Sequence, residues 1–436
     1  MITRNKTRAI YIHVPFCKSK CPYCDFYSSP RHRSEDVEAY VTGLLAEIEQ
    51  TSEQRISEIQ CVQAEVGLGK STQLGSQSSC QVAADTEETY ASWPIETVYF
   101  GGGTPSLLSV PQVAEILDKV RACYDVCLGA EISMEVNPAT VTYDSLCGYR
   151  AAGVNRISIG VQSFDDVVLK ILGRLHSAEE AAETVKMARQ AGFENVSIDL
   201  MFGIAGQSVE SWESTVEKAI ELAPEHISLY TLEIMDNTRF ARDLEKGIYR
   251  QTKPEEDRKM YELALDMLEA AGYRQYEISN AAKPGFECRH NMRYWNMGEY
   301  IGLGPGASSF VGGVRYVNAA DVRAYVESGG SDGSSAINGR CDGAARSPQK
   351  VDVHVNTEED NISEYIFTGL RKSDGISKKD FQERFGDDIW NFYSEEERRE
   401  FQKFVEGGFA EEDEESIRLT RKGMSISNRI MLLFVF

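Results

Sequence analysis

Apolar and β-branched runs alternate along the chain with longer stretches whose apolar residues recur at helical spacing. The runs lie at residues 9–16, 96–102, 131–136, 156–163, 195–203 and 226–234. Helical spacing is present between them, for example at residues 35–50, 111–124, 178–191 and 209–222. Strands that alternate with helices in this way predict a parallel sheet with crossover helices. The predicted fold class is α/β, and periodicity leaves a doubly wound sheet and a barrel both open.

Two segments interrupt this rhythm. Residues 51–93 are polar and lack sustained periodicity, so we predict an insertion between the first helix and the second strand. Residues 328–354 begin with a Gly/Ser-rich stretch and are predicted to be a linker. The predicted domains are therefore a core with its extension at residues 1–327 and a smaller, mostly helical domain at residues 355–436. A β-ribbon is expected near residues 417–420.

Composition and charge narrow the class of protein. The chain has 436 residues, enough to bury a large core, and its net charge of −22 disfavours a nucleic-acid partner. Most of the ten cysteines are scattered, which is typical of a reducing compartment. No apolar run reaches the ~20 residues that span a bilayer, and the segment before the first strand is too short for a signal peptide. These features predict a cytoplasmic protein without a transmembrane segment.

Three cysteines form a C-x3-C-x2-C motif directly after the first predicted strand: Cys17, Cys21 and Cys24. Three thiolates on one loop can hold three irons of a [4Fe–4S] cluster and leave the fourth iron open to a small molecule. A glutaredoxin-type dithiol at Cys21 and Cys24 is one alternative. A zinc site is another, and it needs a fourth ligand near this loop. Neither alternative has a use for Cys17 at this spacing, so the motif favours the cluster.

A second motif, at residues 64–71, resembles a relaxed phosphate-binding loop with alanine in place of its first glycine. Such a loop needs a buried strand before it and a helix after it, so that its amide dipoles converge on phosphate. The preceding residues are only weakly apolar, and the following residues form a poor helix. Nucleotide binding is therefore not expected here.

Polar residues follow several of the predicted strands or stand among their apolar positions. They are Gly102, Gly103 and Thr104 of a Gly-Gly-Gly-Thr-Pro loop, then Glu135, Gln162, Arg174 and Asp199. An unpaired carboxylate among apolar residues is costly, so Glu135 has either a structural partner or a ligand hydroxyl such as a ribose. Arg174 can meet a carboxylate in bidentate fashion. Each residue alone is most simply structural, but together they predict a polar ring around one cofactor.

The cysteine motif resembles that of the radical S-adenosylmethionine (SAM) enzymes, in which the open iron chelates the amino and carboxylate groups of SAM. The resemblance implies a partial (β/α)6 barrel with the cluster loop after the first strand. It also implies that the glycine loop receives the amino group of SAM. The cofactor-binding residues that it implies are Tyr11, Tyr23, Gly102, Gly103, Thr104, Glu135, Gln162, Arg174 and Asp199, with Cys17, Cys21 and Cys24 as metal ligands.

Longer motifs narrow the resemblance to the oxygen-independent coproporphyrinogen III oxidase (HemN-like) group. They are Y-I-H-V-P-F-C-x3-C-x2-C, G-G-G-T-P-S, E-V-N-P, G-V-x-R-I-S-I-G-V-Q-S-F, L-G-R-x-H and D-L-M-F-G. The oxidase branch has a further cysteine where this chain has Phe26, and a longer segment before the motif than the 16 residues here. His290-Asn-Met-Arg-Tyr294-Trp295 matches the H-N-x-x-Y-W signature of the haem-chaperone (HemW) branch. Residues 364–371 and 419–428 resemble the C-terminal domain of that branch. A packed aromatic loop with a hydrogen-bonded imidazole is the structural alternative for that signature.

The resemblance implies a haem chaperone that carries a [4Fe–4S] cluster and SAM, binds haem and passes it to an acceptor protein. A respiratory haem protein is one candidate acceptor, and flavodoxin or ferredoxin is a candidate reductant. His290 is favoured over Cys288 as the haem ligand, because it lies in the signature and imidazole is a common axial ligand. The alternative is an oxidase that decarboxylates the propionates of coproporphyrinogen III by radical chemistry. Whether the chain is an enzyme at all is left open, since the radical SAM apparatus can also be retained as a structural or redox element.

Overall fold

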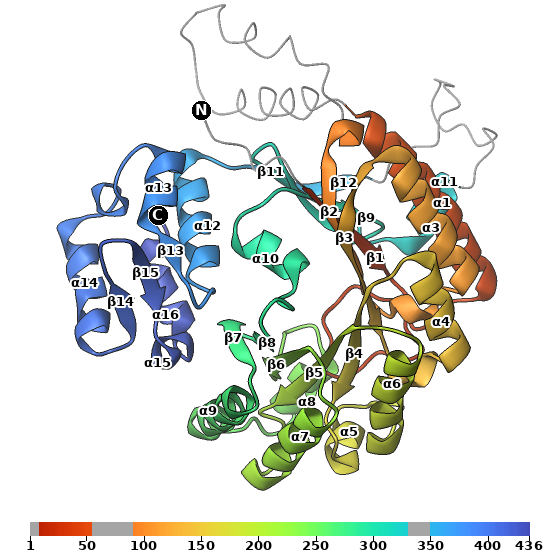
Figure 1. The fold of residues 1–436 in the computed structure, drawn as a ribbon, viewed down its shortest axis with the longest axis horizontal. Helices are drawn as coiled ribbons and strands as arrows, with labels where there is room; N and C mark the ends of the chain where they lie inside the picture. Colours follow the sequence, from red (N-terminus) through yellow and green to blue (C-terminus); the bar gives the residue numbers. More distant parts are fainter. Residues whose placement is uncertain (1–7, 55–89, 330–348) are drawn as a thin grey trace, which may run out of the picture.

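The structure is a computed structural model that describes residues 8–54, 90–329 and 349–436 (Figure 1). Its main feature is a curved 12-stranded sheet with the order β12-β11-β10-β9-β1-β2-β3-β4-β5-β6-β8-β7. The central strands are β1 (Arg8–Val14), β2 (Pro94–Gly102), β3 (Asp125–Val136), β4 (Arg156–Gln162), β5 (Asn195–Phe202) and β6 (His226–Thr231). These neighbours pair in parallel. The order begins at β12 and ends at β7, so the barrel is partial, and the predicted α/β fold class is confirmed.

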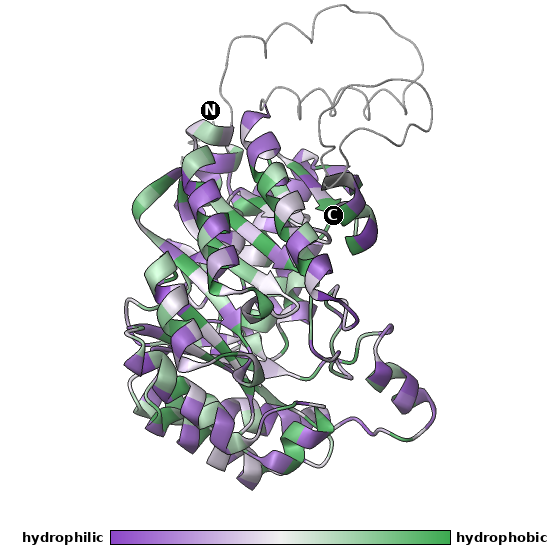
Figure 2. Ribbon diagram, turned by 90° about the vertical axis from the view of Figure 1, so that its right-hand side faces the viewer, coloured by the Kyte–Doolittle hydropathy of each residue, from purple (hydrophilic) through white to green (hydrophobic). Residues whose placement is uncertain are grey.

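Helices cover the outer face of the parallel strands (Figure 1). They are α1 (Ser34–Glu53), α3 (Val110–Cys123), α4 (Tyr143–Ala152), α5 (Asp166–Ile171), α6 (Ala178–Gln190) and α7 (Val209–Glu221). Serine or threonine side chains cap several of them by accepting a backbone N–H of the first turn, as at Ser109, Thr142 and Ser177. Figure 2 shows hydrophilic and hydrophobic residues alternating along these helices, as expected for helices that bury one face against a sheet.

An extension continues the sheet beyond the six parallel strands. It comprises α8 (Arg239–Glu245), α9 (Pro254–Ala270), β7 (Arg274–Glu277), β8 (Asn280–Ala282), α10 (Arg289–Trp295), β9 (Tyr300–Leu303), β10 (Ser308–Val311), β11 (Val314–Asn318) and α11 (Val322–Gly329). Strand β9 pairs in parallel with the free edge of β1, and β8 pairs antiparallel with β6. Helix α10 lies on the concave side of the sheet, where it contacts β2 and helix α12 (Glu358–Gly369) of the C-terminal domain (Figure 1).

The structure differs from the sequence prediction in one additional strand and in several element boundaries. Strand β12 (Lys350–Val355) covers the last five residues predicted as linker, and it pairs antiparallel with β11. Strand β3 begins at Asp125 rather than 131, and helix α1 continues to Glu53. Most of the predicted insertion, including the loop at 64–71, lies outside the described residues.

The C-terminal domain is mostly helical. It contains α12 (Glu358–Gly369), β13 (Ile376–Ser377), α13 (Lys378–Phe385), α14 (Glu395–Glu406), β14 (Ala410–Glu412), β15 (Ser416–Leu419), α15 (Arg421–Met424) and α16 (Ser427–Met431). The expected ribbon is the antiparallel pair β14–β15. Its buried apolar residues, such as Ile366, Phe381 and Phe401, form a cluster separate from that of the barrel. The two separate apolar clusters support the predicted division of the chain into two domains at residues 328–354, which stays a prediction.

A buried carboxylate fastens α1 to the extension. Glu47 is 4% exposed, and its carboxylate accepts hydrogen bonds from the Tyr325 hydroxyl (2.6 Å), the Gly304 N–H (2.8 Å) and the Asn318 amide (2.7 Å). Burial raises the pKa of Glu47 to about 7. The carboxyl therefore stabilises the fold most when protonated, and this contribution is lost as the pH rises through about 7.

We expect Glu47→Ala to lower the free energy of unfolding by ~3 kcal/mol or more, because each buried donor left without an acceptor costs about 1–3 kcal/mol. The loss should be larger below pH 7 than above it, since the protonated carboxyl contributes more. Denaturant unfolding at an acidic and an alkaline pH measures both effects. The control is Glu49→Ala on the same helix, where an exposed carboxylate pairs with Lys119 and little change is expected.

Candidate cluster and cofactor site

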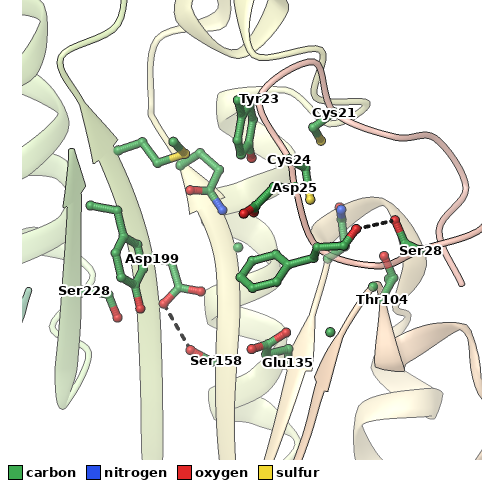
Figure 3. A pocket seen from close by; sticks show the side chains of 18 of the residues that line it. Cys21, Tyr23, Cys24, Asp25, Ser28, Thr104, Glu135, Ser158, Asp199 and Ser228 are labelled. Atoms are coloured by element: carbon green, nitrogen blue, oxygen red, sulfur yellow. Dashed lines mark hydrogen bonds between the residues drawn. The ribbon is translucent and has the colours of Figure 1, made fainter. Parts of the chain in front are cut away.

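A cavity of about 650 Å³ lies at the carboxyl ends of the parallel strands, under the loop that follows β1 (Figure 3). All of the predicted site residues except Tyr11 and His290 line it. They are Cys17, Cys21, Tyr23, Cys24, Gly102, Gly103, Thr104, Glu135, Gln162, Arg174 and Asp199. Carboxyl ends of parallel strands meet at one edge of a sheet, so residues far apart in sequence converge there. Figure 3 shows the loop with Cys24 and Asp25 on one side of the cavity and Glu135 and Asp199 on the other.

The cysteine loop is closed at its base and held at two of its sulfurs. The Cys17 N–H donates to the Ser29 carbonyl (3.2 Å), which ties the end of the loop to its beginning. The Thr104 hydroxyl donates to Cys17 Sγ (3.5 Å), and the Arg174 guanidinium donates to Cys21 Sγ (3.8 Å). The glycine loop after β2 and the residues after β4 therefore position the cysteine loop.

The donor set suits an iron–sulfur cluster better than a single metal ion. In residues 8–54, 90–329 and 349–436, no three His, Cys, Asp or Glu side chains converge as ligands of a single metal ion. A lone zinc ion needs such convergence at ~2.3 Å from each sulfur. Burial raises the pKa of Cys24 to about 11, and the charges of Cys21 and Cys17 add to the rise. Binding of a cationic group to the three sulfurs favours their thiolate forms.

Glycine is required where the loop after β2 approaches the cluster loop. Gly102 has φ +104°, and a Cβ there would lie 2.6 Å from the His13 ring. A Cβ on Gly103 would lie 2.6 Å from the Phe16 carbonyl oxygen. Side chains at these positions would push the two loops apart, so the glycines keep the backbone beside the cavity.

Two carboxylates on neighbouring parts of the sheet face the cavity. Glu135 accepts a hydrogen bond from the Tyr99 hydroxyl (2.9 Å), and Asp199 accepts one from the Ser158 hydroxyl (3.1 Å; Figure 3). Burial raises the pKa of Glu135 to about 7, and the negative charge of Asp199 adds to the rise. Burial also raises the pKa of Asp199. Such carboxylates gain from a cation or hydroxyl donor in the cavity.

Gln162 and Arg174 leave polar atoms unused at the cavity wall. Gln162 adopts φ +66°, which is rare for a residue other than glycine, and its Oε1 is buried with no partner among the described residues. Arg174 donates to the Gly160 carbonyl (2.7 Å), but its Nε is also buried without a partner there. Unsatisfied buried groups are costly in a finished interior. A polar ligand in the cavity could accept from or donate to them.

The sequence prediction missed cavity residues that lie within strands rather than at their ends. On β4 the cavity is lined at every second position by Arg156, Ser158, Gly160 and Gln162. Met201 on β5 and Ser228 and Tyr230 on β6 follow the same alternation. Alternate residues of a strand point to one face. Counting in steps of two back from Gln162 along β4, and forward from Asp199 along β5, would have identified the cavity residues of these two strands.

The two predicted residues outside this cavity belong to another part of the barrel. The Tyr11 hydroxyl is hydrogen-bonded to His13 Nδ1 (3.1 Å), and Tyr11 lines a second cavity. His290 is 1% exposed, with Nδ1 bonded to the Thr97 hydroxyl (2.8 Å) and Nε2 to the Tyr294 hydroxyl (2.8 Å). Burial lowers the pKa of His290 to about 3, so the imidazole is neutral. Neither of its nitrogens is free, as expected for the structural alternative of a hydrogen-bonded imidazole.

Cys288, the other haem-ligand candidate, is also enclosed. It is 0% exposed, and its Sγ lies 3.6 Å from a carboxylate oxygen of Glu131. Burial raises the pKa of this thiol to about 12. Neither ligand named from the sequence lines the cluster cavity or the second cavity beside Tyr11.

Comparison with known proteins identifies the class and then the family. Residues 11–219 match the radical SAM superfamily, and residues 356–426 match the HemN C-terminal domain. Coproporphyrinogen III oxidase (HemN) from Escherichia coli, a radical SAM enzyme, shares the fold with a TM-score of 0.75 at 21% identity, covering 99% of this chain and 91% of that one. The fold and the cysteine loop thus define a radical SAM protein.

Curated relatives place the chain within that class. The heme chaperone HemW of Bacillus subtilis is 32% identical over 98% of this chain and 99% of its own length. HemW of Escherichia coli is 40% identical over 69% of each chain. The chain belongs to the HemW family. Among the described residues, no helix has the length and apolar character needed to cross a bilayer.

Proposed function

We propose that this protein is a haem chaperone: it binds haem, carries a [4Fe–4S] cluster with SAM, and transfers haem to an acceptor protein. The observation that carries the proposal is similarity to heme chaperone HemW over nearly the whole of both chains, C-terminal domain included. A haem acceptor of the respiratory chain and a flavodoxin- or ferredoxin-type reductant fit this role. We also propose a cytoplasmic location.

In this proposal, Cys17, Cys21 and Cys24 hold the cluster. When bound, such a cluster supplies an iron that can chelate SAM and pass an electron to it. Gly102, Gly103 and Thr104 keep the backbone beside the amino group of SAM, and the remaining cavity residues contact the rest of it. These are Tyr23, Glu135, Gln162, Arg174 and Asp199, with Tyr11 behind them in the second cavity wall.

An oxygen-independent coproporphyrinogen III oxidase is the second candidate, because the fold of HemN extends over nearly the whole chain. Phe26 weighs against it. The oxidase branch has a cysteine at this position, whereas Phe26 is 62% exposed at the mouth of the cavity. An apolar ring cannot provide that thiol.

We expect the purified protein, with its cluster reconstituted anaerobically, to bind haem and to leave coproporphyrinogen III unchanged in the presence of SAM and a reductant. Haem titration followed by the Soret band, and chromatography of the porphyrin products, measure the two activities in parallel. The matched variant is Phe26→Cys, which restores the missing cysteine without altering the three cluster ligands. Formation of protoporphyrinogen by the wild type, without stable haem binding, would favour the oxidase over the chaperone.

A further inference from the structure

The cluster cavity extends down the inside of the barrel, well below the cysteine loop. On β4 its lining runs from Gln162 near the loop to Arg156, the first residue of the strand. At ~3.3 Å per residue, these two positions lie roughly 20 Å apart along the strand. Glu135 lies opposite Ser158 in the sheet, so the proposed SAM residues end above Arg156. The floor of the cavity is therefore separate from the proposed SAM contacts.

Arg156 brings a buried positive charge to this floor. It is 2% exposed and lines the cavity, and its Nε has no hydrogen-bond partner among the described residues. The charge of Glu131 acts on Arg156, but the Glu131 carboxylate accepts the N–H groups of Arg289 and His290 at the start of α10 (both 3.1 Å). A buried charge is costly unless it is paired and hydrogen-bonded. Arg156 therefore favours an anionic acceptor in the cavity.

The C-terminal domain brings a second guanidinium to the same cavity. Arg371 follows α12 and lines the cavity, and its Nε is also buried without a partner in the described part of the chain. Its guanidinium carbon lies 4.4 Å from the centroid of the Trp295 ring, a cation–π contact that supports the side chain. Backbone hydrogen bonds hold this segment on the barrel, from the Ile278 N–H to the Arg371 carbonyl and from the Ser373 N–H to the Tyr276 carbonyl (both 3.0 Å). Arg371 is thus placed by the junction of the two domains.

The carboxylates that line this cavity are engaged or exposed. Glu135 accepts a hydrogen bond from Tyr99, and Asp199 accepts one from Ser158. The other two, at residues 25 and 233, are exposed. Because the planar guanidinium fork matches carboxylate and phosphate oxygens, two such groups in one cavity select an oxyanion.

We propose that Arg156 and Arg371 bind the oxyanion groups, carboxylate or phosphate, of a second ligand that shares the cluster cavity with SAM. The barrel supplies one guanidinium and the C-terminal domain the other, so both domains are needed for this site. The proposal goes beyond the haem-chaperone function, since it concerns neither the cargo nor the SAM contacts.

Glu277 on β7 is an alternative partner for Arg371 inside the protein. It is 0% exposed, its Oε1 accepts the Ser279 N–H (3.1 Å), and its Oε2 is buried without a partner among the described residues. The charge of Arg371 acts on Glu277. If the role of Arg371 were only to neutralise Glu277, then Glu277→Gln would make Arg371 dispensable for the fold and Arg371 would contribute nothing to ligand binding.

The test uses the full-length protein with its cluster reconstituted anaerobically and SAM bound. Glutarate is the probe for a carboxylate ligand, and inorganic phosphate is the probe for a phosphate ligand. We expect isothermal titration to show saturable binding of one of them, one molecule per chain, with SAM still bound. No saturable binding of either probe, or binding only by displacement of SAM, overturns the proposal.

Variants locate the probe. Arg156→Gln and Arg371→Gln should each weaken its binding tenfold or more, because each removes a charged hydrogen-bond donor. Arg156→Lys keeps the charge but loses the fork, and should also weaken binding. Glu277→Gln should leave binding unchanged or strengthen it. Arg398→Gln is the matched control for Arg371→Gln, since Arg398 lies 5.6 Å from the Trp390 ring and lines no part of this cavity.

The readouts separate this proposal from the others. Iron content verifies that each variant is folded, and SAM affinity is measured in parallel. Probe affinity that is unchanged in both Arg156→Gln and Arg371→Gln indicates an adventitious ion only and overturns the proposal. Haem titration of the same samples tests the proposed function: loss of haem binding by the wild type contradicts that function alone, whereas failure of the probes contradicts the oxyanion site alone.

Discussion

Replacing any one of Cys17, Cys21 and Cys24 with alanine should abolish the iron–sulfur absorption of the anaerobically reconstituted protein. Wild type should hold about four irons per chain and each variant close to none, because three thiolates are the full protein ligand set of a cluster with an open iron. The structure places these three sulfurs at one cavity, with Thr104 and Arg174 donating to two of them. Loss of one thiol leaves two ligands on a loop whose backbone is already fixed.

The controls are cysteines elsewhere in the chain. Cys123 on α3 and Cys147 on α4 are half-buried thiols on outer helices that do not line the cluster cavity, and their alanine variants should keep full iron content. Replacement of Cys61, Cys80, Cys127 or Cys341 should likewise leave the cluster intact. Iron and sulfide analysis, together with the visible absorption spectrum, measures the outcome. If an alanine at one of these positions removed the cluster while Cys17→Ala kept it, the ligand assignment would be wrong.

SAM affinity should rise with pH through about 7 and then level off, because the ionised carboxylate of Glu135 accepts hydrogen bonds from SAM and attracts its positive charge. Burial and the nearby charge of Asp199 raise the pKa of Glu135 to about 7 in the free protein. Below that pH a proton must leave before SAM binds, so the apparent affinity falls by up to about tenfold per pH unit. Glu135→Gln should remove this dependence and weaken binding at alkaline pH.

Other polar residues of the same cavity should also contribute to SAM affinity. Gln162→Ala, Arg174→Ala and Asp199→Ala each remove a polar contact worth about 1–3 kcal/mol in a buried site, or roughly a 5- to 150-fold change in affinity. Glu131→Gln is the matched control for Glu135→Gln: it lies on the same strand, is 6% exposed and does not line the cavity. Isothermal titration with SAM measures all of them at constant cluster content. Unchanged affinity in all the cavity variants would show that these groups are structural.

The sequence was most informative where chemistry depends on local spacing or on the carboxyl ends of strands. The C-x3-C-x2-C spacing puts three thiols on one loop, and the polar residues on or after β2, β4 and β5 converge because the strands are parallel. Residues in the middle of strands, such as Ser158 and Ser228, were missed although their period of two was visible. Strand β12 was also missed, although its sequence K-V-D-V-H-V places valine at every second position, which is a period typical of strands.

The position of His290 could not be read from the sequence. Its hydrogen-bond partner Thr97 lies 193 residues earlier in the chain, and the bond forms because α10 packs across β2 on the concave side of the sheet. A motif indicates which residue types occur together, but not which of them faces the ligand. In this structure the tyrosine of the signature lines the second cavity beside Tyr11, and the histidine stands behind it.

Asp25 and Phe26 line both the cluster cavity and the second cavity beside Tyr11, so this short stretch of loop is a partition, a shared wall between two chambers. A displacement of the partition when one chamber fills changes the shape of the other. Thermodynamic linkage then requires reciprocity: the factor by which SAM alters the affinity for haem must equal the factor by which haem alters the affinity for SAM. Titrating each ligand with and without the other therefore measures one coupling free energy twice, and Phe26→Ala, which thins the partition, should reduce it.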